Sequence, residues 1–99
     1  MSKASIERKL TNVSSELSSI IEELQILTEQ LAYVEDIASE SRMRALVSET
    51  PIAANEYKES MKSVEALKRD FNSKTKKKSK LENKQDKLLD DLSRLLNKN

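Results

Sequence analysis

The chain has 99 residues, a net charge of +1, a charged fraction of 35% and an aromatic fraction of 3%. It contains no glycine, no cysteine and no histidine, and it has a single proline. Without cysteine there is neither a disulfide framework nor a thiolate metal site, and without histidine the commonest general base is missing. This composition disfavours an ordinary globular core with turns and favours long helices in one domain.

Apolar residues from Ile6 to Ala38 recur at alternating spacings of four and three residues. A mean spacing of about 3.5 residues predicts the seam of a coiled coil. Beyond Ala38 we expect the seam to fade into a helical face of shifted phase, carried by Met43, Leu46 and Val47. The heptad places five residues at a (Leu10, Leu17, Leu24, Leu31, Ala38) and five at d (Ile6, Val13, Ile20, Leu27, Val34).

The segment from Ser48 to Pro51 is the one break signal in the chain. Proline suits the first position of a helix, and Thr50 before it is a natural N-cap. A second heptad follows, with Tyr57, Val64, Phe71, Lys78, Gln85 and Leu92 at a, and Ser60, Leu67, Lys74, Leu81, Leu88 and Leu95 at d. We therefore expect a frayed segment over residues 1–5 and one helical hairpin over 6–97, with helices at about 5–47 and 51–96 and a turn at 48–50.

An antiparallel pairing of the two heptads sets residues whose numbers sum to 98 opposite each other, for example Leu17 and Leu81. The pivot of this register falls at residue 49, inside the break signal. Position g then faces g, which predicts three ion pairs of opposite sign: Glu23 with Lys77, Glu16 with Lys84, and Lys9 with Asp91. The predicted fold is all-α, an antiparallel two-helix coiled-coil hairpin.

The same register sets apolar residues of the first helix opposite polar residues of the second, Ile20 opposite Lys78 and Leu24 opposite Lys74. Lysine covers an apolar surface poorly, so we expect the first helix to be uncovered there. Two helices cannot enclose a core, and two hairpins closing into a four-helix bundle is the simplest solution. The predicted partner or dimer interface consists of Ile20, Ile21, Leu24, Leu27 and Leu31.

Enzyme motifs are absent: there is no phosphate-binding loop, no nucleophile and base pairing, and no metal-ligand cluster. We therefore expect a protein that is not an enzyme and takes no cofactor, metal or small-molecule substrate. No segment approaches 18 apolar residues, so no membrane span is expected. By elimination, we place the chain in the cytoplasm.

Charge is segregated along the chain, with seven acids and no base from Leu10 to Ser41, and seven lysines against two acids from Asn72 to Leu88. The densest cluster, Lys74, Lys76, Lys77, Lys78 and Lys80, is a candidate anion-binding site within the Lys74–Lys87 tract. Neither an aromatic residue nor an arginine interleaves these lysines, so nucleic acid is possible but not favoured. Pairing with acids of the first helix, together with solvation, is the favoured interpretation.

The hairpin tip, residues 42–52, admits two interpretations. In the favoured one, Leu46, Val47 and Ile52 close the end of the core. In the other, the tip is a recognition surface with Arg42 and Arg44 as contact residues.

The string from Arg44 to Pro51 resembles one in small actinobacterial helical-hairpin (coiled-coil) proteins, and Leu88-Leu89-Asp90 is similar to the Leu-Leu-Asp run at their ends. Those proteins are rich in arginine and alanine, whereas this chain is rich in lysine and serine. The resemblance covers about ten residues, and it implies the hairpin fold and no particular activity.

The sequence thus predicts a coiled-coil interaction or scaffolding module that self-associates, as a dimer, or docks a partner helix through its first helix. One alternative is a small protein that binds nucleic acid or another polyanion through Lys74–Lys87. Another is a subunit that folds only on a partner. The pattern leaves open whether the hairpin is closed, swapped between chains or opened into one long helix.

Overall fold

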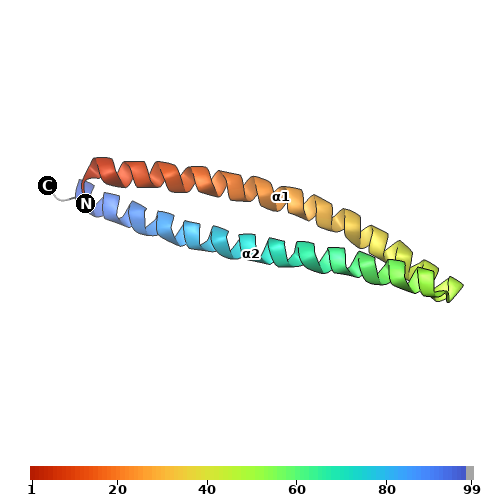
Figure 1. Ribbon diagram of the computed structural model, residues 1–99. Helices are drawn as coiled ribbons and strands as arrows, with labels where there is room; N and C mark the ends of the chain where they lie inside the picture. Colours follow the sequence, from red (N-terminus) through yellow and green to blue (C-terminus); the bar gives the residue numbers. More distant parts are fainter. Residues whose placement is uncertain (98–99) are drawn as a thin grey trace. The chain divides into compact units, whose positions relative to one another are not determined.

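The computed structural model describes residues 1–97, and they form two helices joined by two residues (Figure 1). Helix α1 is Lys3–Ser48 and helix α2 is Pro51–Leu96, each 46 residues long. Residues 1–97 include no strand, so the all-α prediction is confirmed. The ranges expected from the sequence were about 5–47 and 51–96.

The helix ends are fixed by local hydrogen bonds. The Ser5 amide donates to Ser2 Oγ at 3.2 Å, and the Ala53 amide donates to Thr50 Oγ1 at 3.2 Å, so Ser2 and Thr50 are the N-caps. Helix α1 ends where Glu49 takes a positive φ of 51°, with its amide donating to the Ala45 carbonyl at 3.2 Å. Glycine usually occupies this left-handed position, but the chain has none.

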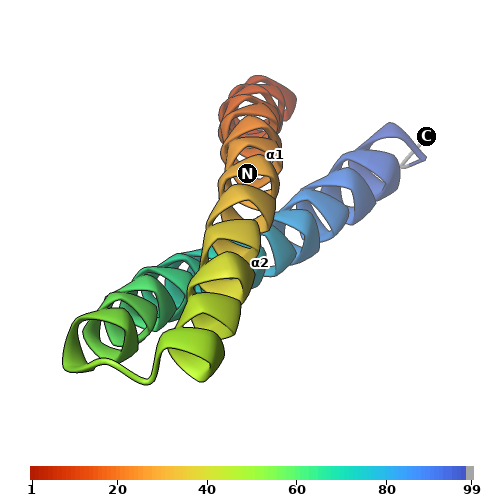
Figure 2. The same cartoon turned by 90° about the vertical axis from the view of Figure 1, so that its right-hand side faces the viewer.

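The chain divides into two compact units. Unit 2 is the continuous segment 24–73, a helical hairpin in which the chain reverses direction at residues 49–50 (Figure 2). Unit 1 combines residues 1–23 of the chain with residues 74–99. Its described part pairs the start of α1 with the end of α2.

The core of each unit is a single seam of a and d side chains between the helices. Unit 1 buries Ile6, Val13, Leu17, Ile20, Leu81 and Leu88, and unit 2 buries Leu27, Ala38, Ser41, Ala53 and Val64. Every one of these residues occupies an a or d position of the predicted heptads or of their continuation toward the turn. The heptad assignment is therefore confirmed.

The expectation that the seam would fade after Ala38 is wrong. The same heptad continues through Ser41, which is 2% exposed, to the half-buried Ala45, whereas Met43 and Val47 lie in solvent. The seam remains closed because Ser41 finds a polar partner across it: Ser41 Oγ and Ser60 Oγ lie 3.3 Å apart. Small side chains let the two helices approach closely here.

Contacts between the helices lie close to the predicted register, in which the numbers of facing residues sum to 98. In unit 1, Lys74 Nζ lies 3.7 Å from Glu23 Oε2, and the numbers of this pair sum to 97. In unit 2, the Ser41 and Ser60 pair sums to 101. The three predicted g–g ion pairs do not form within residues 1–97, since Glu23 bonds to Lys74 instead of Lys77 and the other two pairs stay apart.

The expectation that the first helix would be uncovered opposite the lysines is wrong for Ile20, which is 4% exposed, whereas Leu24 is only half-buried. Lys74 and Lys78 are both half-buried at their seam positions. Their aliphatic stems can occupy the seam while the charged ends reach its edge, which is where the Lys74 ammonium meets Glu23.

Candidate functional site

The five predicted interface residues of α1 fall into two groups. Ile20 and Leu27 are buried by the chain itself, so they are inaccessible to a partner while the hairpin is intact. Ile21 is 51% exposed, and Leu24 and Leu31 are half-buried. Surface for a partner is therefore available at the second group only.

The division follows the two layers of the seam. The d layer of α1 is mostly buried, whereas the a layer is mostly half-buried, as are the a residues of α2, which lie on the same side of the seam. The seam is thus open on its a side, where the neighbouring e positions extend it. We call this side, the a and e positions of both helices, the open face. Its large apolar a residues that are half-buried are Leu10, Leu24, Leu31, Tyr57, Phe71 and Leu92.

In unit 2 the open face contains a groove of about 250 Å³. Its floor includes Ala38, Tyr57 and Val64, with Met61 beside them. A small side chain at Ala38 leaves space that a leucine at the same heptad position would fill. Three charged e residues also line the groove: Glu35, Arg42 and Lys68.

In unit 1 the open face carries three large exposed apolar side chains, Ile21, the 48% exposed Leu89 and the 56% exposed Leu96. Half-buried Leu10 and Leu92 lie at a positions of the same face. The Gln85 amide, at an a position, donates to Ser14 Oγ, at an e position, at 3.3 Å. Gln85 and Ser14 of this face thus pair with each other, whereas its apolar residues remain accessible.

Sequence reasoning missed the contribution of α2 to this face. Tyr57, Met61 and Leu89 were not among the predicted interface residues. The signal was present in the second heptad, in which these residues occupy a and e positions. It was overlooked because the heptad pattern does not by itself show which side of a two-helix seam is open.

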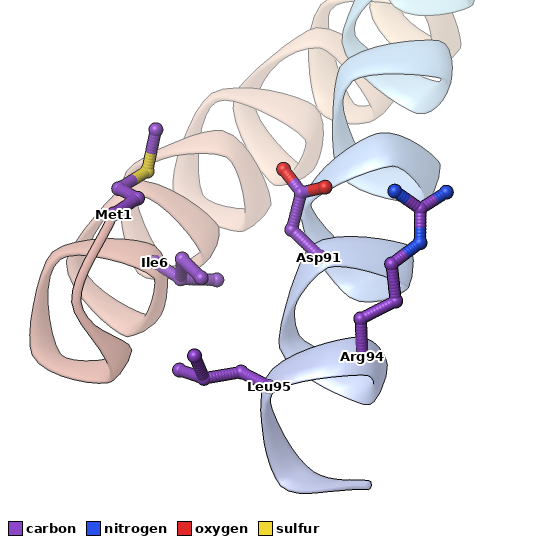
Figure 3. Close-up of a pocket in the computed structure, with 5 residues that line it drawn as sticks. All are labelled: Met1, Ile6, Asp91, Arg94 and Leu95. Carbon is purple, nitrogen blue, oxygen red and sulfur yellow. The ribbon is translucent and has the colours of Figure 1, made fainter. Parts of the chain in front are cut away.

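A second hollow, of about 340 Å³, lies at the end of unit 1 (Figure 3). Ile6 and Leu95 point toward one another across it, with Met1, Asp91 and Arg94 around them. Small-molecule sites combine apolar walls with several convergent polar groups, which two charged side chains at a rim do not supply. Within residues 1–97, moreover, no three acidic side chains cluster in a way that could hold a metal ion.

The candidate anion-binding lysines also divide. Lys74 is bonded to Glu23 and Lys78 is half-buried in the seam, whereas Lys76, Lys77 and Lys80 are exposed. None of these three exposed lysines forms an ion pair in the described part of the chain, so pairing with acids of the first helix is seen for Lys74 alone.

Further lysines extend this exposed surface along α2. Residues three or four apart share one face of a helix, so Lys76, Lys80, Lys84 and Lys87 form a lysine stripe about 16 Å long. All four side chains are exposed. The two acids in this part of α2, Glu82 and Asp86, occupy e and b positions away from the stripe.

At the hairpin tip, the interpretation that Leu46, Val47 and Ile52 close the core is wrong, since they are 64%, 82% and 74% exposed. The core ends instead at the small residues Ser41 and Ala53.

The two candidate tip contacts have different environments. Arg44 Nη2 donates to Ser41 Oγ at 3.1 Å, and Arg44 Nε lies 3.9 Å from Glu56 Oε2, so Arg44 is engaged within the chain. Arg42 lines the groove of unit 2.

No protein-family model, curated protein or solved structure matches this chain. Neither α1 nor α2, over residues 1–97, includes a stretch apolar enough to cross a bilayer.

Proposed function

We propose that this protein is a non-enzymatic interaction module, a helical hairpin that self-associates through its open face. The observation that supports this most directly is the asymmetry of the seam. The d residues of α1 are largely buried. On the a side, leucine and isoleucine side chains of unit 1 and leucine and aromatic side chains of unit 2 are left half-buried or exposed. Scaffolding follows from such association, because a dimer presents two copies of every outer surface.

The energetic argument rests on apolar area. Burying one large apolar side chain fully stabilises by about 1.5–3 kcal/mol relative to leaving it in water. Several side chains of the open face are only partly buried, so burying them further would stabilise an assembly by part of that free energy. They are Ile21 and Leu89 in unit 1, and Leu24, Leu31 and Tyr57 in unit 2. Two hairpins joined by their open faces form a four-helix bundle, which buries this surface on both copies at once.

The chain offers a matched pair of isoleucines for the test. Ile21 and Ile26 are 51% and 53% exposed, but Ile21 occupies an e position of the open face and Ile26 a c position outside it. A glutamate at position 21 would be placed in an apolar interface without a partner, which is costly. In sedimentation equilibrium, Ile21→Glu should weaken self-association at least about tenfold, whereas Ile26→Glu should leave it unchanged.

A wild-type chain that stays monomeric at the highest accessible concentration would rule out self-association. Far-UV circular dichroism of the isolated chain then decides between the remaining versions of an interaction module. A helical monomer fits a module that docks another protein's helix, and a poorly helical one fits a subunit that folds on its partner.

A second candidate function, binding of nucleic acid or another polyanion, is favoured by one observation: the lysine stripe is exposed. Backbone phosphates attract such a stripe without sequence specificity, and their affinity for it falls steeply with salt. The absence of interleaved aromatic residues limits stacking on bases, so the expected binding is electrostatic only.

Heparin and duplex DNA are the probes for this candidate. The variant Lys76→Glu, Lys80→Glu, Lys87→Glu should lose retention at low salt, while Lys58→Glu, which changes an exposed lysine of unit 2, should keep it. Wild-type protein that passes through both columns at low salt would remove this candidate.

A further inference from the structure

We propose that the second copy docks head to tail, with the open face of unit 1 of one chain against the open face of unit 2 of the other. This orientation rests on the proposed self-association and specifies its geometry. In a twofold dimer the contact between unit 1 and unit 2 then occurs twice. The occupant of the groove in unit 2 is thus unit 1 of the second copy.

The first argument is the charge at the edge of the two faces. Charged e positions in unit 1 are acidic, Glu7 and Glu82, and Lys78, a charged a residue of this face, is half-buried in the seam. In unit 2 the charged e positions include two bases, Arg42 and Lys68, beside one acid, Glu35, and all three line the groove. Unit 1 on unit 2 therefore sets opposite charges near each other, while like units facing each other would set acids near acids and bases near bases.

The second argument is that these edge charges are available. Arg42, Lys68 and Glu82 form no ion pair within residues 1–97. Glu7 pairs only with Lys3, at 3.8 Å and with both side chains more than half exposed. Such an exposed pair contributes little, so reversing these four charges should leave the hairpin itself folded.

The orientation is tested by charge reversal in two halves. The variant Glu7→Lys, Glu82→Lys makes the edge of unit 1 basic, and the variant Arg42→Glu, Lys68→Glu makes the edge of unit 2 acidic. In a head-to-tail dimer each variant alone sets like charges together, so we expect the dissociation constant at low salt to rise at least about tenfold in both. The four-charge variant restores opposite signs and the wild-type net charge, so we expect it to dimerise within about threefold of wild type.

The matched control is Glu22→Lys, Asp90→Lys, which makes the same change of net charge in unit 1 at exposed f positions off the open face. We expect it to weaken the dimer by less than about threefold. Circular dichroism should show equal helicity in all variants.

A wild-type dimer that none of these reversals weakens would overturn the head-to-tail orientation and leave self-association intact. Two-charge variants that weaken the dimer without rescue in the four-charge variant would overturn it as well. A monomeric wild type would remove both proposals. Loss of heparin retention in the lysine-stripe variant alone, with no dimer formed, would leave polyanion binding as the function.

Discussion

Ser41 shows how a single polar residue can belong to an apolar seam. It is 2% exposed, and its hydroxyl lies 3.3 Å from that of Ser60 and accepts a hydrogen bond from Arg44. Arg44 in turn lies near Glu56, on the same helix as Ser60. Because the buried hydroxyl is satisfied only when these residues are aligned, the cluster favours one register over slipped alternatives.

At the residue scale the sharpest prediction compares two isoleucines of α1. Ile20 is 4% exposed and Ile26 is 53% exposed outside the open face. Ile20→Ala leaves a cavity in the seam and should lower the free energy of unfolding by about 2–5 kcal/mol. Ile26→Ala should change it by less than about 0.5 kcal/mol. Urea unfolding followed by circular dichroism measures both, and equal effects would mean that Ile20 is not in a seam.

Ile20 also shows the limit of reading burial from residue types. The sequence places it opposite Lys78, and a lysine in a seam suggests an uncovered partner. The structure buries Ile20 all the same, with Lys74 and Lys78 half-buried in the seam. A lysine is polar only at its end, and whether its stem covers a neighbour depends on whether the ammonium can reach water or an acid, as Lys74 reaches Glu23.

At the scale of the element, the two helices are separated by only two residues in a chain without glycine. Glu49 takes the left-handed conformation that glycine would adopt more easily, which costs about 1–2 kcal/mol. The N-cap and the proline at the start of α2 offset this cost, because they stop α1 from continuing and satisfy an amide of α2.

Thr50 is therefore expected to stabilise the hairpin through its hydroxyl. Thr50→Ala removes the acceptor of the Ala53 amide and should cost about 0.5–2 kcal/mol. Thr50→Ser retains the oxygen and should stay close to wild type. Thermal unfolding followed at 222 nm compares the three proteins, and a Thr50→Ala midpoint equal to that of wild type would exclude a stabilising cap.

The elements were the most predictable part of the structure. Alternating spacings of three and four gave α1, Pro51 marked the start of α2, and the antiparallel register followed from setting the two heptads in phase around residue 49. The open face could not be predicted from the sequence, since a and d positions are both apolar in a heptad and the pattern does not show which of them is more exposed. Which layer is buried depends on the rotation of each helix about its axis, and side chains such as Ala38, Ser41 and Ser60 decide this through their volumes.

At the scale of the whole molecule, the tight turn raises the question of whether α1 pairs with α2 of its own chain. A short connection between two long helices is a typical site of exchange between chains. The structure pairs them within one chain, and in unit 1 the Gln85 amide meets Ser14 Oγ at 3.3 Å. Since the chain has no cysteine, single cysteines can carry labels without interference.

Spin labels at Ser14→Cys and Asp86→Cys, one residue from Gln85, should therefore report a short distance. That distance should persist when labelled protein is unfolded and refolded together with a tenfold excess of unlabelled protein, because the two labelled helices belong to one chain and pair with each other. Loss of the short distance on such dilution in the wild type would mean that the arms are exchanged.

Replacing the turn provides the opposite case. The variant Glu49→Ala, Thr50→Ala, Pro51→Ala removes the cap and the proline and favours a single helix through residues 48–52, since alanine is the strongest helix former. A chain with no turn can cover its seam only with another chain. We therefore expect the short distance in this variant to remain in undiluted samples and to disappear on dilution with unlabelled variant. That result would mean that residues 49–51 cause the hairpin to close within one chain, whereas the heptads pair with or without the turn.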